Sequence, residues 1–173
     1  MSDEDVKTTW IQMFALPDRP IPAPRDGLAV VHARNPPVHY YRYLYDVVGR
    51  EYDWTSRCRM SDEQLGAILS NPRNELHVLH VEGVPAGMAE LDRRQAGEIE
   101  ITQFGLVRGF LGQGLGRWFL RWAIEYAFGF PLNRLWLHTC TRDHAAALPN
   151  YLKSGFAVYR EEVRTESPPK PVS

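Results

Sequence analysis

Hydrophobic positions recur along the chain with two different periods, and these periods predict an ordered series of strands and helices. Two-residue alternation and β-branched or aromatic runs predict strands at 8–15, 28–33, 75–82, 86–93, 98–107, 134–140 and 156–164. Helical spacing predicts helices between Pro37 and Gly49, from Ser61 onwards, over 114–129 and over 143–155. The series ββ-αα-βββ-α-β-α-β indicates an α/β fold with a mixed sheet.

Local signals show where some of these elements begin, turn or bend. Residues 61–64, Ser-Asp-Glu-Gln, form a capping box, in which the first side chain caps the fourth amide and the fourth side chain reaches back. Residues 83–85, Gly-Val-Pro, separate two strand runs and predict a hairpin. Pro149 removes one backbone hydrogen bond from the last helix, so we expect a kink just before Tyr151.

The composition is that of one ordinary globular domain over 1–173. The chain is 44% hydrophobic and 24% charged, and its net charge of -1 gives no reason to expect nucleic acid or an acidic membrane as a partner. Its two cysteines form no CxxC pair and its N-terminus has no signal-peptide pattern, so we expect a reducing cytoplasm. No run reaches the roughly 18 apolar residues that span a bilayer. The proline-rich tail, about 167–173, is expected to be disordered.

The most informative segment is 98–126, where an alternating strand runs through a glycine-rich turn into an amphipathic helix. Gly112, Gly114 and Gly116 allow positive φ and a close approach of backbone N–H groups to an anion, and the helix N-terminus favours the same charge. A P-loop is excluded because Arg117 follows the last glycine, and a dinucleotide fingerprint is excluded because Arg117 takes the place of its third glycine. A plain hairpin is disfavoured because this turn enters a helix.

Two ordered motifs resemble those of the GNAT superfamily of acyl-CoA-dependent N-acetyltransferases. Residues 111–116, Leu-Gly-Gln-Gly-Leu-Gly, resemble its phosphate loop, Arg/Gln-x-x-Gly-x-Gly/Ala, and residues 151–156 resemble its Tyr-x-Lys-x-Gly-Phe ending. The resemblance covers about 27–165. It implies a mixed, mostly antiparallel sheet of about six to seven strands flanked by about four helices, with an extra strand in front and one final strand where the family usually has two.

The resemblance also implies a function. It implies an N-acetyltransferase that takes acetyl-CoA as co-substrate and lets an amine attack directly in a ternary complex. The residues expected at the cofactor are Leu106, Val107, Arg108, Leu111, Gly112, Gln113, Gly114, Leu115, Gly116, Arg117 and His144. Leu111 departs from the family's Arg or Gln, so we expect weakened rather than abolished binding, with Arg108 and Arg117 supplying charge nearby.

Carboxylates and one tyrosine are the candidates for proton transfer. Glu98 and Glu100 share one face of the 98–107 strand, and by position Glu100 resembles the general base of some family members. Glu98 is expected to be solvated or paired with Arg93 or Arg94. Glu90 is the second candidate, as base or as a carboxylate that recognises an ammonium group, and a water chain is the alternative to either. Tyr151 is the family's general acid by position, and a tyrosine that merely packs in the core is the alternative.

Aromatic and basic residues interleave between the first two predicted helices, where the resemblance implies the acceptor site. We expect Tyr40, Tyr41, Trp54 and Arg57 to bind the acceptor, although core aromatics and solvated arginines would give the same pattern. The acceptor is expected to be a small-molecule or protein amine, and a homodimer is left open. No metal site is expected, because His77 and His80 face opposite sides of a strand. A non-catalytic acyl-CoA-binding or regulatory domain is the alternative function.

Overall fold

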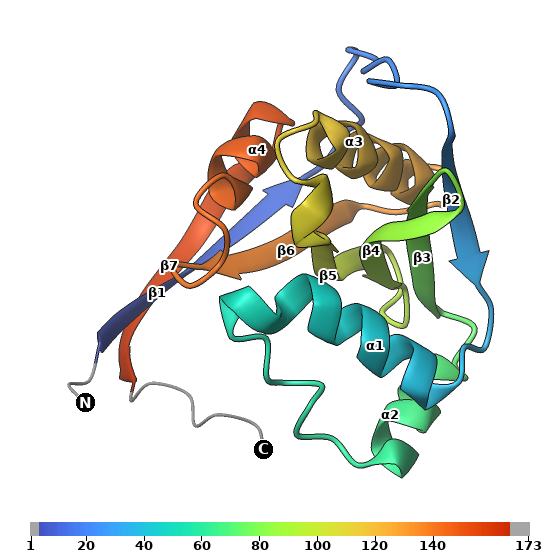
Figure 1. Cartoon of the computed structure of the whole chain (residues 1–173). Helices are drawn as coiled ribbons and strands as arrows, with labels where there is room; N and C mark the ends of the chain where they lie inside the picture. The colour runs from blue at the N-terminus through green and yellow to red at the C-terminus, as the bar shows by residue number, and fades with distance from the viewer. Residues whose placement is uncertain (1–3, 167–173) are drawn as a thin grey trace.

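Seven strands form one twisted sheet in the computed structural model, which describes residues 4–166 (Figure 1). The strands are β1 (Glu4–Met13), β2 (Leu28–Ala33), β3 (Asn74–Val81), β4 (Val84–Asp92), β5 (Glu98–Leu106), β6 (Arg134–Cys140) and β7 (Ala157–Glu166). Their order in the sheet is β2-β3-β4-β5-β6-β1-β7, and every neighbouring pair is antiparallel except β5 and β6. The predicted mixed, mostly antiparallel sheet is therefore confirmed. The tail expected to be disordered, 167–173, lies outside the described residues.

Helices lie on both faces of this sheet. They are α1 (Val38–Gly49), α2 (Asp62–Leu69), α3 (Leu115–Phe128) and α4 (Ala147–Lys153), with short 3₁₀ turns η1 (Arg50–Tyr52) and η2 (Arg108–Phe110). Figure 1 shows α3 and α4 on one side of the sheet and α1 and α2 on the other. The predicted capping box opens α2, since the Gln64 amide donates to the Ser61 hydroxyl at 3.2 Å and the Ser61 amide donates to the Gln64 side chain at 2.9 Å. No helix within residues 4–166 combines the length and the hydrophobicity needed to cross a bilayer.

The N-terminal strand lies inside the sheet rather than at its edge. It begins at Glu4, earlier than the pattern at 8–15 indicates, and it pairs with β6 on one side and with β7 on the other. Thr9, Ile11 and Met13 alternate into the core beneath α3 and α4, which fixes the register of the strand. The extra strand in front thus separates β6 from the single final strand.

The last helix is shorter than its pattern predicts, and this changes the role of its proline. α4 begins at Ala147, so Pro149 falls in the first turn, where a backbone N–H group has no acceptor within the helix. The helix continues unbroken, and the Asn150 amide donates to the Ala146 carbonyl at 3.0 Å. The kink expected before Tyr151 is wrong, because it assumed a helix that starts four residues earlier.

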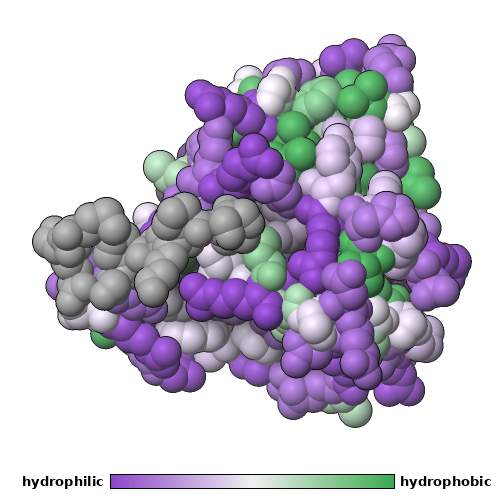
Figure 2. Space-filling model, turned by 60° about the horizontal axis from the view of Figure 1, so that its bottom comes forward, coloured by the Kyte–Doolittle hydropathy of each residue, from purple (hydrophilic) through white to green (hydrophobic). Residues whose placement is uncertain are grey.

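Two hydrophobic clusters pack against the two faces of the sheet. One joins α3 and α4 to all central strands, and its residues include Ile99, Ile101, Phe119 and Tyr151. The other joins α1 and α2 to β3 and β4. In Figure 1 the sheet formed by β6, β1 and β7 extends beyond α1 and α2. Seen with the bottom of the molecule turned forward, hydrophilic residues cover most of the surface and hydrophobic residues gather toward the upper right (Figure 2).

Candidate active site

The parallel strands β5 and β6 separate halfway along their length. They pair only at Glu98 with Arg134, Ile99 with Leu135, and Glu100 with Trp136. Beyond this point β5 continues to pair with β4, as far as Leu106, and β6 continues to pair with β1, as far as Cys140. The carboxyl ends of two adjacent strands therefore diverge in the middle of the sheet, which leaves backbone groups on their facing edges without strand partners.

The turn after β5 has the geometry of an anion site. Gly112 has φ 73° and Gly114 has φ 76°, a left-handed conformation that glycine adopts without a steric penalty. Gly114 is the N-cap of α3, no side chain caps this helix, and its first turn contains no acidic residue. Among the described residues, no backbone carbonyl accepts from the successive amides of 112–117. These free N–H groups and the helix dipole fit the pyrophosphate of CoA.

The other residues expected at the cofactor differ in whether they already make ion pairs or hydrogen bonds with described residues. Arg108 is tied to Glu51 at 2.6 Å, while Arg117 lies in the first turn of α3 and makes no ion pair with a described residue. The Val107 amide donates to the Ala86 carbonyl at 2.8 Å and is therefore engaged in the sheet. His144 lies beyond the separated end of β6 and accepts from the Ala146 amide through Nδ1 at 3.0 Å. The roles expected for these residues stay predictions.

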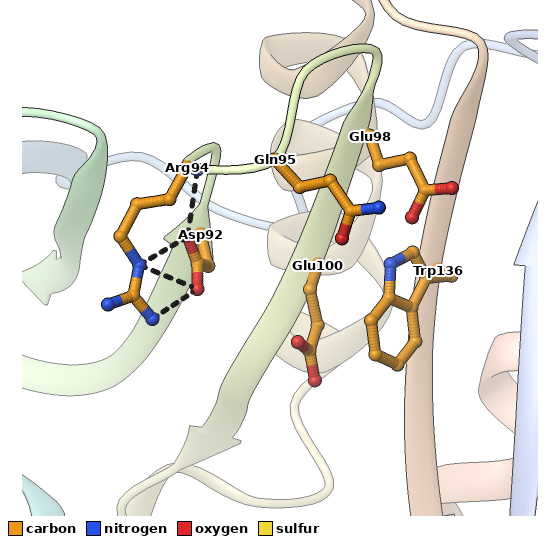
Figure 3. A pocket seen from close by; sticks show the side chains of 6 residues that line it. All are labelled: Asp92, Arg94, Gln95, Glu98, Glu100 and Trp136. Atoms are coloured by element: carbon orange, nitrogen blue, oxygen red, sulfur yellow. Dashed lines mark hydrogen bonds and ion pairs between the residues drawn. The ribbon is translucent and has the colours of Figure 1, made fainter.

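A pocket of about 370 Å³ lies at the other end of the separation, where β5 and β6 still pair (Figure 3). It is lined by Asp92, Arg94, Gln95, Glu98, Glu100 and Trp136. Because Ile99 and Ile101 point into the core on the α3 side, Glu98 and Glu100 face the opposite side of the sheet. In Figure 3 the Glu100 side chain and the Trp136 ring lie side by side.

The three carboxylates of this pocket differ in what neutralises them. Arg94 binds Asp92 through its side chain at 2.7 Å, and Arg134 binds Glu98 at 2.9 Å. Glu100 makes no hydrogen bond with a described residue, and its nearest ionic neighbour is Nδ1 of His138 at 3.6 Å. Glu100 is thus the one of these three carboxylates without an arginine partner among the described residues, whereas Glu98 binds Arg134 and not Arg93 or Arg94, the partners that we expected from the sequence.

Glu90 occupies a very different environment from Glu100. It is completely buried on the α1 side of the sheet, where the Tyr41 hydroxyl donates to one carboxylate oxygen. The Arg57 guanidinium donates to the other oxygen at 2.5 Å, as does Asn74 at 3.1 Å. A carboxylate satisfied by three donors and closed off from solvent ties α1 and the following loop to the sheet.

The residues expected to bind the acceptor divide between core and surface. Tyr41 is completely buried, and burial together with the charge of Glu90 raises its pKa well above the ordinary value. Arg57 leaves 11% of its side chain exposed. Tyr40 and Trp54 are partly buried, and Trp54 donates from Nε1 to Asp143 at 3.3 Å. The acceptor role of Tyr41 and Arg57 stays a prediction that their burial does not favour.

Tyr151 lies beside the separated half of β5. Its ring packs edge-on against Phe104 at 6.3 Å and against Phe156 at 6.2 Å. Burial, and to a smaller extent the charge of Asp143, raises the pKa of Tyr151 well above that of a free phenol. The group is therefore protonated at neutral pH, as a proton donor must be. Tyr151 thus packs in the hydrophobic core, and its role as a general acid stays a prediction.

One cluster of polar side chains was not expected from the sequence. The Glu75 carboxylate accepts from Nε of Arg93 at 2.8 Å and from the Tyr126 hydroxyl at 2.6 Å, and it lies 3.1 Å from Nε2 of His77. His32, paired with His77 across β2 and β3, completes a group with the geometry to hold a metal ion. Because Glu75 is already satisfied by its neighbours, the group is a hydrogen-bond network in this structure. Glu75 and His77 share one face of β3, but Arg93, Tyr126 and His32 come from distant parts of the chain, so local spacing does not reveal the whole network.

Solved structures share the fold at low sequence identity. A GCN5-related N-acetyltransferase from Sphaerobacter thermophilus superposes with a TM-score of 0.63 at 18% identity, covering 94% of this chain and 51% of that one. A tandem GNAT protein from the clavulanic acid biosynthesis pathway has a TM-score of 0.66 at 15% identity, with 98% and 56% covered. An aminoglycoside acetyltransferase from an uncultured soil sample, crystallised with sisomicin, has a TM-score of 0.63 at 12% identity, with 84% and 98% covered.

The chain spans between 51% and 63% of the length of four of the structures that share its fold. None of the curated proteins matches its sequence. The model described as "Acetyltransferase (GNAT) family" matches residues 33–156, which include the separated strands, the anion site and Tyr151. The chain belongs to the GNAT acetyltransferase family.

Proposed function

We propose that the chain is a cytoplasmic N-acetyltransferase that transfers the acetyl group of acetyl-CoA to an amine by direct attack in a ternary complex. The observation that carries the proposal is the separation of β5 from β6, with the glycine turn at one end and, at the other, the carboxylate of Glu100, whose ionic neighbour among the described residues is His138. The CoA pyrophosphate would bind the amides of 112–117, and the pantetheine arm would run back between the strands. Membership of the acetyltransferase family supports this assignment.

Glu100 and Tyr151 divide the proton transfers of the proposed reaction. Glu100 takes a proton from the acceptor ammonium, directly or through a water molecule, and the free amine attacks the thioester carbonyl. The tetrahedral intermediate collapses with cleavage of the carbon–sulfur bond, and the Tyr151 hydroxyl donates its proton to the departing thiolate. The attacking nitrogen loses its second proton to water, and water returns a proton to the Tyr151 phenolate. Backbone N–H groups on the freed edge of β5 are suited to stabilise the oxyanion. Glu90 is assigned to holding α1 in place, because its carboxylate is already bound by three donors.

The pocket beside Glu100 is the proposed acceptor site. One uncompensated carboxylate beside an indole ring favours a cationic amine, through the ion pair and through contact with the aromatic face. Trp54 and Tyr40, which we expected at the acceptor from the sequence, are partly buried on the α1 side and do not line this pocket. The solved structures that share this fold include an aminoglycoside acetyltransferase in complex with sisomicin, so amines of that size belong among the candidates.

The test is the transfer of label from acetyl-CoA to an amine. The protein is incubated with acetyl-CoA that carries carbon-13 in its acetyl group and with a library of amines, and products are identified by mass spectrometry. A labelled amide that forms only with the folded protein supports the proposal. Binding of acetyl-CoA without any labelled product would favour the alternative, a non-catalytic acyl-CoA-binding domain, which Leu111 in place of a family Arg or Gln leaves open.

A further inference from the structure

Trp54 spans the separation between β5 and β6 on the α1 side of the sheet. Its ring packs on Gly49, where a Cβ atom would come within 2.5 Å of the indole, and against Tyr45 at 5.3 Å between centroids. The outer edge of the ring lies over Gly105 of β5, since a Cβ there would meet the indole at 3.4 Å. At the other side its Nε1 donates to Asp143, in the loop after β6.

The partners of Trp54 hold the ring in this position. Asp143 accepts from the Thr139 hydroxyl at 2.5 Å and from the Cys140 amide at 2.9 Å, which fixes its carboxylate to the end of β6. The left-handed backbone of Asp53, with φ 54°, turns the chain so that the indole points back over the sheet. The Trp54 ring is therefore held between Gly105 of β5 and Asp143 in the loop after β6.

The ring lies on the route that an acyl chain must take, if the function proposed above holds. A thioester whose pyrophosphate binds at 112–117 and whose carbonyl lies within reach of an amine on Glu100 has to pass along the freed edge of β5. Phe104 and Tyr151 pack on the α3 side of this edge, in one hydrophobic cluster. Trp54 packs on the α1 side, with the other cluster. The acyl end would thus be enclosed between these two groups of rings.

We infer that Trp54 limits the length of the acyl group, so that the site accepts acetyl-CoA and rejects longer acyl-CoA thioesters. Replacing the indole by a small side chain removes the ring that would limit the acyl chain, while the glycine turn and Glu100 stay in place. Each methylene that then finds an apolar cavity gains about tenfold in kcat/KM, the usual discrimination per methylene in an apolar pocket. The inference rests on the proposed function, but it concerns a residue that neither the phosphate loop nor the proton transfers require.

The experiment compares acetyl-, propionyl- and butyryl-CoA with wild type and Trp54→Ala, with thermal stabilisation and thiol release as separate readouts. We expect Trp54→Ala to raise the butyryl-to-acetyl ratio of kcat/KM by about 100-fold, and to raise stabilisation by butyryl-CoA relative to acetyl-CoA. Trp54→Phe keeps a ring and should keep the acetyl preference. The matched control is Tyr43→Ala, which removes an exposed aromatic ring from α1 and should leave both ratios unchanged.

The outcomes separate this inference from the proposed function. If all acyl-CoA thioesters bind and the ratio is the same in wild type and in Trp54→Ala, the inference is overturned and the proposed function stands. If no thioester stabilises any variant, both fail together. Should Trp54→Ala not fold, Trp54→Leu retains the packing on Tyr45 and still shortens the wall, so an unchanged ratio in that variant counts against the inference equally.

Discussion

Glu100 of β5 and Trp136 of β6 form the last residue pair between these strands before they diverge. The pair stands where a reactive thioester and an acceptor would have to meet. On one side of it the sheet is closed and carries the pocket of Figure 3, and on the other side the strands open toward the glycine turn. The glycine turn and Glu100 therefore lie at opposite ends of a single interruption of sheet pairing, and Tyr151 packs against Phe104 of β5.

Replacing Gly114 tests the anion site alone. Gly114→Asp adds a side chain where φ is 76° and places a negative charge at the helix N-terminus, so acetyl-CoA should no longer stabilise the protein. In wild type, stabilisation should reach about 2.7 kcal/mol at a ligand concentration one hundred times Kd. The matched control is Gly83→Asp, in the turn between β3 and β4, where φ is 81° and a Cβ meets no other atom. A ligand-induced rise in Tm that survives in Gly114→Asp would place the cofactor elsewhere.

Removing the charge of Glu100 tests the base. Glu100→Gln should lower kcat by about 10²-fold or more near neutral pH, and high pH should restore part of the rate because more of the amine is already free. Glu98→Gln is the control, since Arg134 already neutralises that carboxylate and its kcat should change little. If kcat depends on pH in the same way in wild type and in Glu100→Gln, Glu100 is not the general base, and proton transfer through a water chain is favoured.

Deleting one hydroxyl group tests the acid. Tyr151→Phe should slow kcat by about 10²- to 10⁴-fold while leaving acetyl-CoA affinity and Tm almost unchanged, because only the proton donor is lost. Tyr126→Phe is the matched control. It should lower Tm and leave kcat almost unchanged, because its hydroxyl donates to Glu75 at 2.6 Å. A lower Tm with normal turnover in Tyr151→Phe would identify it as a core residue.

The Glu75 network predicts how stability depends on pH. Burial alone would raise the pKa of Glu75, but hydrogen bonds from His77, Tyr126 and Arg93 outweigh it and lower the pKa from its ordinary 4.5 to about 2. A depressed pKa means that the contribution is fully present above about pH 4.5 and is lost as the pH falls toward 2. We expect roughly 2 to 3 kcal/mol of the free energy of unfolding to disappear over this range, measured by urea denaturation. Glu75→Gln should flatten that dependence, and an equally steep profile in the variant would contradict the assignment.

The sequence predicts those parts of the site that depend on neighbouring residues. The order of strands and helices, the glycine turn and the shared face of Glu98 and Glu100 follow from local periods, and all appear in the structure. The insertion of β1 between β6 and β7 does not follow, because strand partners far apart in sequence leave no local period. For the same reason the aromatic pattern of 40–54 does not distinguish Tyr41, which is buried on α1, from Trp54, which lies in the loop after η1 and reaches Asp143.

The start of the last helix shows a different limit of local patterns. Hydrophobic spacing extends it to 143, whereas the carboxylate of Asp143 is bound to Thr139 and to Trp54 and the helix begins at Ala147. Tertiary hydrogen bonds therefore decide the boundary. Because the helix begins at Ala147, Pro149 lies in its first turn and causes no kink before Tyr151.

Release of CoA thiol from acetyl-CoA, measured as a function of amine concentration, distinguishes an acetyltransferase from a domain that only binds acyl-CoA. We expect initial rates that rise with the amine concentration and saturate, and that fall to background in Gly114→Asp. When both substrates are varied, the double-reciprocal plots should give intersecting rather than parallel lines. Acetyl-CoA that binds at the glycine turn without amine-dependent thiol release, for every amine in the library, would contradict the claim that the chain is an acetyltransferase.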